Sequence, residues 1–259
     1  MGDEWWYAAA SVIAAGGGWL LRSLSVSGAA AAVVVGTLVG CGFSWSGLWL
    51  LGLFFASSSF FSNVGKRKKA KMAGKLAKDG RRDAVQVLAN GGVPAVLALL
   101  ALLCPASVWN ELFVVAVAAA NADTWASEIG ALSRRPPRAW PSFRPVEAGT
   151  SGAVTPLGTV ASLAGALFIA AAGAHFLHAA PLFTIALFGW LGSWLDTWLG
   201  AAWQSVYRCP VCGAATERKR HCGRKTIHVK GWRWLDNDAV NALSVAGAVL
   251  AAAFVLVRW

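Results

Sequence analysis

Residues 108–132 read VWNELFVVAVAAANADTWASEIGAL, and this stretch decides the fold. A predominantly apolar segment of roughly 17–25 residues can cross a bilayer as a helix. The second half of this stretch adds polar and acidic side chains, which are costly in lipid and normally face a protein interior or a wet cavity. The stretch therefore predicts a membrane-spanning helix with functional groups near one of its ends.

The composition of the whole chain supports a membrane protein. Of its 259 residues 57% are hydrophobic and 14% are charged, whereas a soluble domain carries about 25% charged residues. This leaves too little polar surface for a soluble globule and too many apolar residues for a disordered chain. Fifteen Trp against two Tyr also fit a membrane protein, because Trp favours membrane interfaces.

The hydrophobic runs predict an all-α, polytopic membrane bundle of about eight transmembrane helices, forming a single integral membrane domain over residues 1–259. The second run is short and rich in Ala and Gly, so a half-span or re-entrant segment is the alternative there. We expect no secretory signal peptide, because the first run begins with acidic residues instead of a basic region. The expected spans are Trp5–Leu21, Val26–Gly40, Trp45–Phe61, Ala84–Cys104, Val108–Leu132, Leu157–Leu177, Leu182–Ala202 and Asp236–Val257.

The basic residues predict the orientation. With eight spans, 22 of the 23 Lys and Arg residues fall on one side, and Arg258 is the exception. The positive-inside rule makes that side cytoplasmic, so we expect a protein of the cytoplasmic (plasma) membrane with both termini outside. The run Lys66–Lys78 fits attraction to anionic lipid or a phosphate-rich substrate. Nucleic acid is not expected as a partner despite the net charge of +11, because the loops are short and lack a binding motif.

Polar side chains gather at the cytoplasmic ends of the fourth and fifth spans. Arg82, Gln86 and Asn90 recur every four residues and share a helix face; an interhelical hydrogen-bonded seam is the alternative. In the fifth span, Asp123 and Glu128 place two carboxylates in one arc, together with the polar residues Asn121, Thr124 and Ser127. Mg²⁺ takes such oxygen ligands together with substrate phosphates, whereas a proton relay or an Arg partner would also balance the charge.

The last two spans carry similar groups. Asp196 lies beside a polar stripe that ends at Gln204, and helix packing does not explain it. Asn237 and Asn241 share a face of the final span, where Asp236 or Asp238 could cap the helix N-terminus. Because all four groups lie at cytoplasmic helix ends, we expect them to converge on one site facing the cytoplasm.

The loop after the fifth span is rich in Gly, Thr and Ser. Thr150, Ser151 and Gly152 lack the Lys of a P-loop, but backbone N–H groups before a helix can cradle phosphate. A flexible connector is the alternative. Arg144, which follows Arg134, Arg135 and Arg138, could pair with phosphate oxygens.

Residues 205–235 form a cytoplasmic loop that resembles a small zinc knuckle. Cys209-x₂-Cys212 with a downstream His221-Cys222 pair supplies four tetrahedral ligands. Adjacent ligands are poorly spaced, so His228 is an alternative fourth ligand, and free thiols are the alternative to metal. A disulfide is not expected on the reducing side of the membrane.

The most specific strings are NADTWASEIG at 121–130 and GTSG at 149–152. Together with Gln86–Gly92, Gly192–Gln204 and Asp236–Ser244 they resemble the integral-membrane domain-of-unknown-function family that includes plant phytyl-phosphate kinase and vertebrate transmembrane protein nineteen. The resemblance implies an isoprenoid (polyprenyl) monophosphate kinase that uses a nucleoside triphosphate. The string DTWAS is also distantly similar to a dolichol kinase pattern, which favours CTP over ATP.

The expected reaction is phosphoryl transfer from CTP or ATP to an isoprenoid monophosphate in the bilayer, giving the diphosphate. Cytidylyl transfer to a lipid phosphate and transport of an anionic lipid or phosphate are the alternatives. The sequence leaves the isoprenoid chain length and the oligomeric state open. We expect Mg²⁺ at Asp123, Glu128 and Asp196, and the expected substrate-binding residues are Arg82, Gln86, Asn90, Asn121, Ser127, Arg144, Thr150, Ser151, Gly152, Gln204, Asn237 and Asn241.

Overall fold

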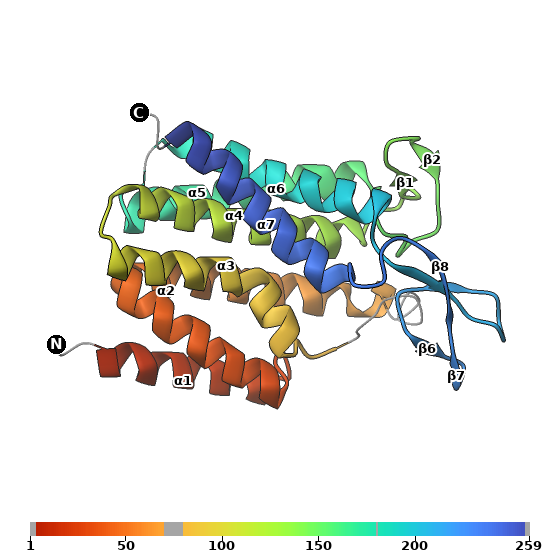
Figure 1. The fold of residues 1–259 in the computed structure, drawn as a ribbon, viewed down its shortest axis with the longest axis horizontal. Helices are drawn as coiled ribbons and strands as arrows, with labels where there is room; N and C mark the ends of the chain where they lie inside the picture. The colour runs from red at the N-terminus through yellow and green to blue at the C-terminus, as the bar shows by residue number, and fades with distance from the viewer. Residues whose placement is uncertain (1–3, 70–79, 180, 257–259) are drawn as a thin grey trace.

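A computed structural model describes residues 4–69, 80–179 and 181–256; for residues 65–69 it describes the backbone alone. Lys71, Lys75 and Lys78 of the basic run predicted to mark the cytoplasmic side, and Arg258, lie outside the described residues. The chain is mostly helical (Figure 1). The helices are α1 Glu4–Leu20, α2 Val26–Lys69, α3 Ala84–Leu103, α4 Val108–Gly130, α5 Pro156–Phe176, α6 Leu182–Ala202 and α7 Asn237–Leu256.

Helix α4 is the centre of the bundle. Every residue from Leu112 to Ala122 is buried, as expected of a helix that is apolar all round. Helices α2, α3, α5, α6 and α7 all contact it. Glycines bring two of these neighbours unusually close: a Cβ on Gly173 of α5 would lie 2.4 Å from Val114, and one on Gly189 of α6 would lie 2.6 Å from Ala118. Such small residues allow close backbone packing between membrane helices.

Helix α2 consists of two halves separated by a kink at Ser44, where φ is 56° and ψ is −158°. The halves run antiparallel, because Leu48 of the second half lies against Gly36 and Gly40 of the first. Further along, Phe55 reaches Gly18 at the end of α1, and Figure 1 shows the second half returning along the bundle. The two halves correspond to the predicted second and third spans.

The predicted membrane helices are confirmed in type but not in number. Among the described residues, six helices are long and apolar enough to cross a membrane, and residues 26–64 count as one of them. Helix α1, with 17 residues, is not among the six. About eight spans is therefore not shown and stays a prediction.

All the strands lie at one end of the bundle, whereas α1 begins and α7 finishes at the other (Figure 1). The sequence predicts only loops here, because strands of two to four residues are too short to show an alternating pattern. They form sheets of order β2-β1-β3 and β5-β4-β8 and the hairpin β6-β7. The strands are β1 Arg138–Ala139, β2 Arg144–Pro145, β3 Ala153–Val154, β4 Val206–Arg208, β5 Ala215–Thr216, β6 Arg220–His221, β7 Arg224–Lys225 and β8 Ile227–Lys230.

Candidate active site

A polar cavity of about 780 Å³ lies at the end of the bundle that carries the strands. Helices α3 to α7, the loop 148–155 and residues 217–220 line it. The structure thus brings all four predicted polar groups together. The predicted site residues on its wall are Arg82, Gln86, Asn90, Asp123, Ser127, Glu128, Thr150, Ser151, Gly152, Asp196, Gln204, Asn237 and Asn241.

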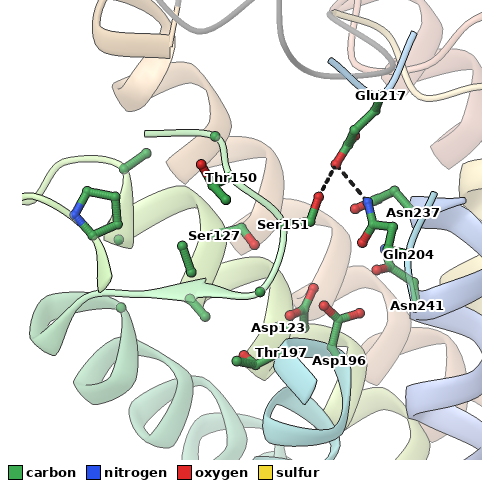
Figure 2. A pocket seen from close by; sticks show the side chains of 18 of the residues that line it. Asp123, Ser127, Thr150, Ser151, Asp196, Thr197, Gln204, Glu217, Asn237 and Asn241 are labelled. Carbon is green, nitrogen blue, oxygen red and sulfur yellow. Dashed lines mark hydrogen bonds between the residues drawn. The ribbon is translucent and has the colours of Figure 1, made fainter. Parts of the chain in front are cut away.

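Two carboxylates from neighbouring helices meet in this cavity. Figure 2 shows Asp123 of α4 and Asp196 of α6 with their carboxylates side by side. Asn241 of α7, with its amide turned to donate, places nitrogen 2.8 Å from Asp196 Oδ2. Two adjacent carboxylates repel each other unless a cation or a proton lies between them. Their oxygens, with Glu128 further along the α4 wall, fit the donor preference of Mg²⁺.

The loop that precedes α5 is packed against α6. A Cβ on Gly152, where φ is 70°, would lie 2.4 Å from Ala201 of α6. The carbonyl of Gly152 accepts from Trp140 N at 3.2 Å, and the Thr150 hydroxyl donates to the Glu147 carbonyl at 2.7 Å. These contacts join the loop to α6, and it presents Thr150 and Ser151 to the cavity.

Two helices begin at the cavity. In α5, Thr155 is the N-cap and its hydroxyl accepts from Gly158 N at 3.0 Å, with Pro156 as the first helical residue. In α7, Asp236 Oδ1 accepts from Ala239 N at 3.1 Å, so the capping alternative holds for Asp236. The positive end of the helix dipole favours anions at such positions. The two N-termini therefore favour negative charge at these parts of the cavity wall, and Asp236 already supplies such a charge at α7.

The α3 wall combines structural and cavity-lining roles. Asp83 and Gln86 form a capping box at the start of α3, and the Asn90 amide donates to the Gln86 carbonyl at 3.1 Å. The main chain of Arg82 bonds to Ser23 and Ser25 between α1 and α2. Although these contacts hold Gln86 and Asn90 partly to their own helix, both still line the cavity.

Two predicted site residues lie elsewhere. Asn121 is fully buried; it donates to the Gly165 carbonyl of α5 at 2.9 Å and accepts from the Ser57 hydroxyl of α2 at 3.2 Å. It shares a helix face with Glu128 but lies about two turns deeper, where α5 covers it. Arg144 is exposed in β2 and is not part of the cavity wall. Neither residue lines the cavity in this structure, so their predicted roles in substrate binding stay predictions.

The prediction also missed Glu217, which lies in the segment after β5. Its Oε1 accepts from Ser151 Oγ at 2.9 Å and from Gln204 Nε2 at 2.7 Å (Figure 2). One carboxylate oxygen thus joins the loop before α5, the end of α6 and the insert 205–235. The available signal was that Glu217 is the only acidic residue among the basic residues of 205–235.

A family match covers most of this architecture. The family described as "Integral membrane protein DUF92" matches residues 9–249. The chain belongs to the DUF92 family. This confirms the predicted family and establishes an integral membrane protein.

Relatives of this DUF92 chain occur in plants and archaea. It is 32% identical to Protein PGR of Arabidopsis thaliana over 256 residues, which cover 86% of each chain. It is 38% identical over 152 residues to an uncharacterized membrane protein of Methanocaldococcus jannaschii, covering 57% of this chain and 60% of the relative. Protein VTE6, chloroplastic, of Arabidopsis thaliana is 25% identical over 247 residues, covering 91% of this chain and 67% of the relative. No solved structure matches.

The cysteine-rich insert of this DUF92 chain forms the predicted ligand cluster. One ligand atom from each of Cys209, Cys212, His221 and Cys222 lies within 4.8 Å of the others, so they could hold a metal such as zinc. Adjacent His221 and Cys222 both reach the centre, and Cys222 adopts a φ of 49° in the β6-β7 turn. His228, the alternative ligand, is outside this cluster and instead packs on the Tyr207 ring, with centroids 5.3 Å apart.

Cys209 is prepared for ligation by its surroundings. A hydrogen bond from the backbone of Cys212 is the largest influence that lowers the pKa of the Cys209 thiol, to about 6. A lower thiol pKa favours the thiolate, which is the metal-binding form.

Proposed function

We propose that this protein is an isoprenoid-monophosphate kinase, which transfers a phosphoryl group from a nucleoside triphosphate to a lipid monophosphate. The observation that carries the proposal is the pairing of Asp123 and Asp196 in a polar cavity at the end of a membrane bundle. Membership of the DUF92 family supports the proposal, because the resemblance to this family implies an isoprenoid-monophosphate kinase. A lipid phosphate has its tail in the bilayer and its head at the bundle end, where these groups lie.

The proposed topology has eight crossings, with α1 and each half of α2 as separate spans. The antiparallel course of the α2 halves supports this count. The cavity then opens to the cytoplasm, where nucleoside triphosphates are available. The described basic residues of 134–144 and 208–233 fall on that side, as the positive-inside rule requires, and both termini lie outside.

The chemistry requires positioning and charge neutralisation more than covalent catalysis. Asp123 and Asp196 would hold Mg²⁺, with Glu128 as a further ligand; when bound, the ion neutralises phosphate charge. The N-terminus of α5 and the loop residues Thr150, Ser151 and Gly152 would bind the donor phosphates. The acceptor is already an anion, so the reaction needs no strong general base.

The remaining wall residues orient the two phosphates. Arg82 would neutralise charge on the α3 side, and the amides of Gln86, Asn90, Gln204, Asn237 and Asn241 would donate to phosphate oxygens, as would the hydroxyl of Ser127. The isoprenoid tail would lie between helices in the bilayer. CTP is favoured over ATP as donor on the distant similarity of DTWAS to dolichol kinases.

The test is a turnover assay on the purified chain in lipid nanodiscs. Phytyl, geranylgeranyl and shorter isoprenyl monophosphates are supplied with Mg²⁺ and either CTP or ATP, and products are identified by mass spectrometry. We expect lipid diphosphate and stoichiometric nucleoside diphosphate. A CDP-lipid product would instead indicate cytidylyl transfer, and phosphate or lipid flux without nucleotide consumption would indicate transport; either result overturns the proposal.

A further inference from the structure

The ligand cluster and the cavity are connected by one short stretch of chain. Residues 213–220 leave Cys212 and return to His221, two of the four cluster residues. Between them, residues 217–220 line the cavity. The four ligand positions therefore flank a segment that forms part of the cavity wall.

This segment is attached to the cavity by directed polar contacts. Glu217 accepts from Ser151 and Gln204, as described above. On its other side, Thr226 donates through its hydroxyl to the Arg218 carbonyl at 2.7 Å and through its backbone to the Lys219 carbonyl at 3.1 Å. These contacts join the segment of Glu217 to the end of the β6-β7 hairpin, which carries His221 and Cys222, two of the four cluster residues.

Apolar packing does not hold the outer part of the insert. Val211, Ile227 and Val229 are 62%, 59% and 47% exposed, and its strands have two to four residues. Small units without a core are usually held by a metal or by disulfides. The described cysteines are all free thiols, which leaves the ligand cluster as the available cross-link.

We propose that one zinc ion bound by Cys209, Cys212, His221 and Cys222 holds residues 213–220 over the cavity and thereby positions Glu217 against Ser151 and Gln204. Three thiolates and one imidazole form a closed structural zinc site. In a tetrahedron with zinc–sulfur bonds of about 2.3 Å, ligand atoms lie about 3.8 Å apart, so the observed limit of 4.8 Å needs only slight closure. A consequence, which rests on the proposed function, is that Arg218, Lys219 and Arg220 complete the binding side for the nucleotide phosphates.

The zinc content of the purified protein tests the metal site. Inductively coupled plasma mass spectrometry on the purified full chain should find about one zinc per chain, and growth with Co²⁺ should give thiolate-to-cobalt absorption bands. Cys212→Ser and Cys222→Ser should each remove most of the metal. Cys41→Ser and Cys104→Ser are matched controls at free cysteines outside the cluster and should keep it. Wild-type protein with no zinc, or zinc retained in both cluster variants, would overturn the proposal.

The positioning role is tested by hydrogen exchange, which needs no enzymatic activity. Removing zinc through Cys212→Ser should speed exchange at least tenfold in residues 148–155 as well as in 213–220. Glu217→Ala should speed exchange in 148–155 while retaining zinc. This variant therefore distinguishes loss of the Glu217 hydrogen bonds from loss of the metal. Unchanged protection of 148–155 in the zinc-free variant would show that the cluster does not position the cavity loop.

Nucleotide binding separates this inference from the proposed function. If both hold, Cys212→Ser should raise the Kd for Mg²⁺-CTP or Mg²⁺-ATP about tenfold, whereas Cys104→Ser should leave it unchanged. If wild-type protein binds no nucleotide while the zinc and exchange results appear as expected, the kinase proposal fails and the zinc-held link stands. Unchanged affinity in Cys212→Ser would remove the basic segment from nucleotide binding.

Discussion

Helix α4 and the insert 205–235 are held in opposite ways. In α4 the eleven residues from Leu112 to Ala122 are buried, and the helix satisfies its backbone internally, as a membrane requires. The insert exposes Val211 and Ile227 and is held by hydrogen bonds together with, as we propose above, a zinc ion at the ligand cluster. The candidate site lies where the two regions meet, so rigid packing places Asp123 and polar contacts place Glu217. We therefore expect that different substitutions can disrupt turnover and the order of the insert separately.

The largest expected effect comes from the carboxylate pair. Asp123→Asn keeps the shape of the side chain but removes its charge from the proposed metal and phosphate site, so turnover should fall on the order of 10³-fold, measured as diphosphate formed per enzyme. Glu111→Gln, a carboxylate near the other end of α4, is the control and should retain activity. Undiminished turnover in Asp123→Asn would remove this residue from the mechanism.

Gly152→Ala should damage the junction between bundle and loop. A left-handed φ of 70° costs a non-glycine residue about 1–2 kcal/mol, and the new Cβ would also meet the backbone of Ala201 at 2.4 Å. We expect a stability loss of about 3 kcal/mol or a displaced loop with weak activity, followed by thermal unfolding and turnover.

Gly213→Ala provides the matched control. Gly213 has a φ of 73°, but its added Cβ would meet nothing within 4 Å. Its effect on stability should therefore be limited to backbone strain. Equal losses in the two variants would show that contact with Ala201 is unimportant.

Gly189→Ala tests the packing between α4 and α6. Its Cβ would lie 2.6 Å from that of Ala118 on α4, and overpacking of this kind costs about 1–3 kcal/mol. Denaturation in detergent should show a lower midpoint, whereas Gly52→Ala, which has open space around it, should not. A stable Gly189→Ala protein would mean that α6 can move away from α4 without cost.

The smallest expected effect is at Asn121. Its removal leaves the Gly165 carbonyl without its donor, and hydrogen bonds between membrane helices are worth about 0.6–2 kcal/mol. Asn121→Ala should lower stability by about 1 kcal/mol with turnover within a few-fold of wild type. Asn241→Ala, on the cavity wall, should instead lower turnover and spare stability, so a reversed pattern would restore Asn121 to the site.

Hydrophobic length made the helices predictable. The predicted span Leu182–Ala202 coincides with α6, and Ala84–Cys104 differs from α3 by one residue, because the bilayer sets the length of a crossing segment. The sequence also located the turn between the second and third spans, which the structure places at Ser44. The short strands of the inserts were not predictable, since they depend on pairing with distant segments.

The site was predictable as a set of helix ends but not in depth or in its long-range contacts. Asn121 and Glu128 lie on the same side of the α4 axis, which led to the prediction that both line the site. Nothing in the sequence pattern indicates that α5 covers Asn121, which lies deeper in the bundle. Glu217 bonds to a residue 66 positions away, which no local pattern reveals. The spacing argument against His221 and Cys222 failed because a turn with φ of 49° at Cys222 lets adjacent residues share a centre.

The glycine–alanine contact between α4 and α6 has a mechanical consequence for the two carboxylates. Gly189 and Gly192 interlock with Ala118 and Ala119, about one to two turns from Asp196 and Asp123. This interlock prevents the helices from sliding past each other, and it thereby fixes the distance across which the aspartates face. A methyl group added between these two helices would push them apart. The distance between the two aspartates would then change, although the methyl group does not touch them. The spacing of the two aspartates is therefore set by helix packing inside the bundle, away from the carboxylates themselves.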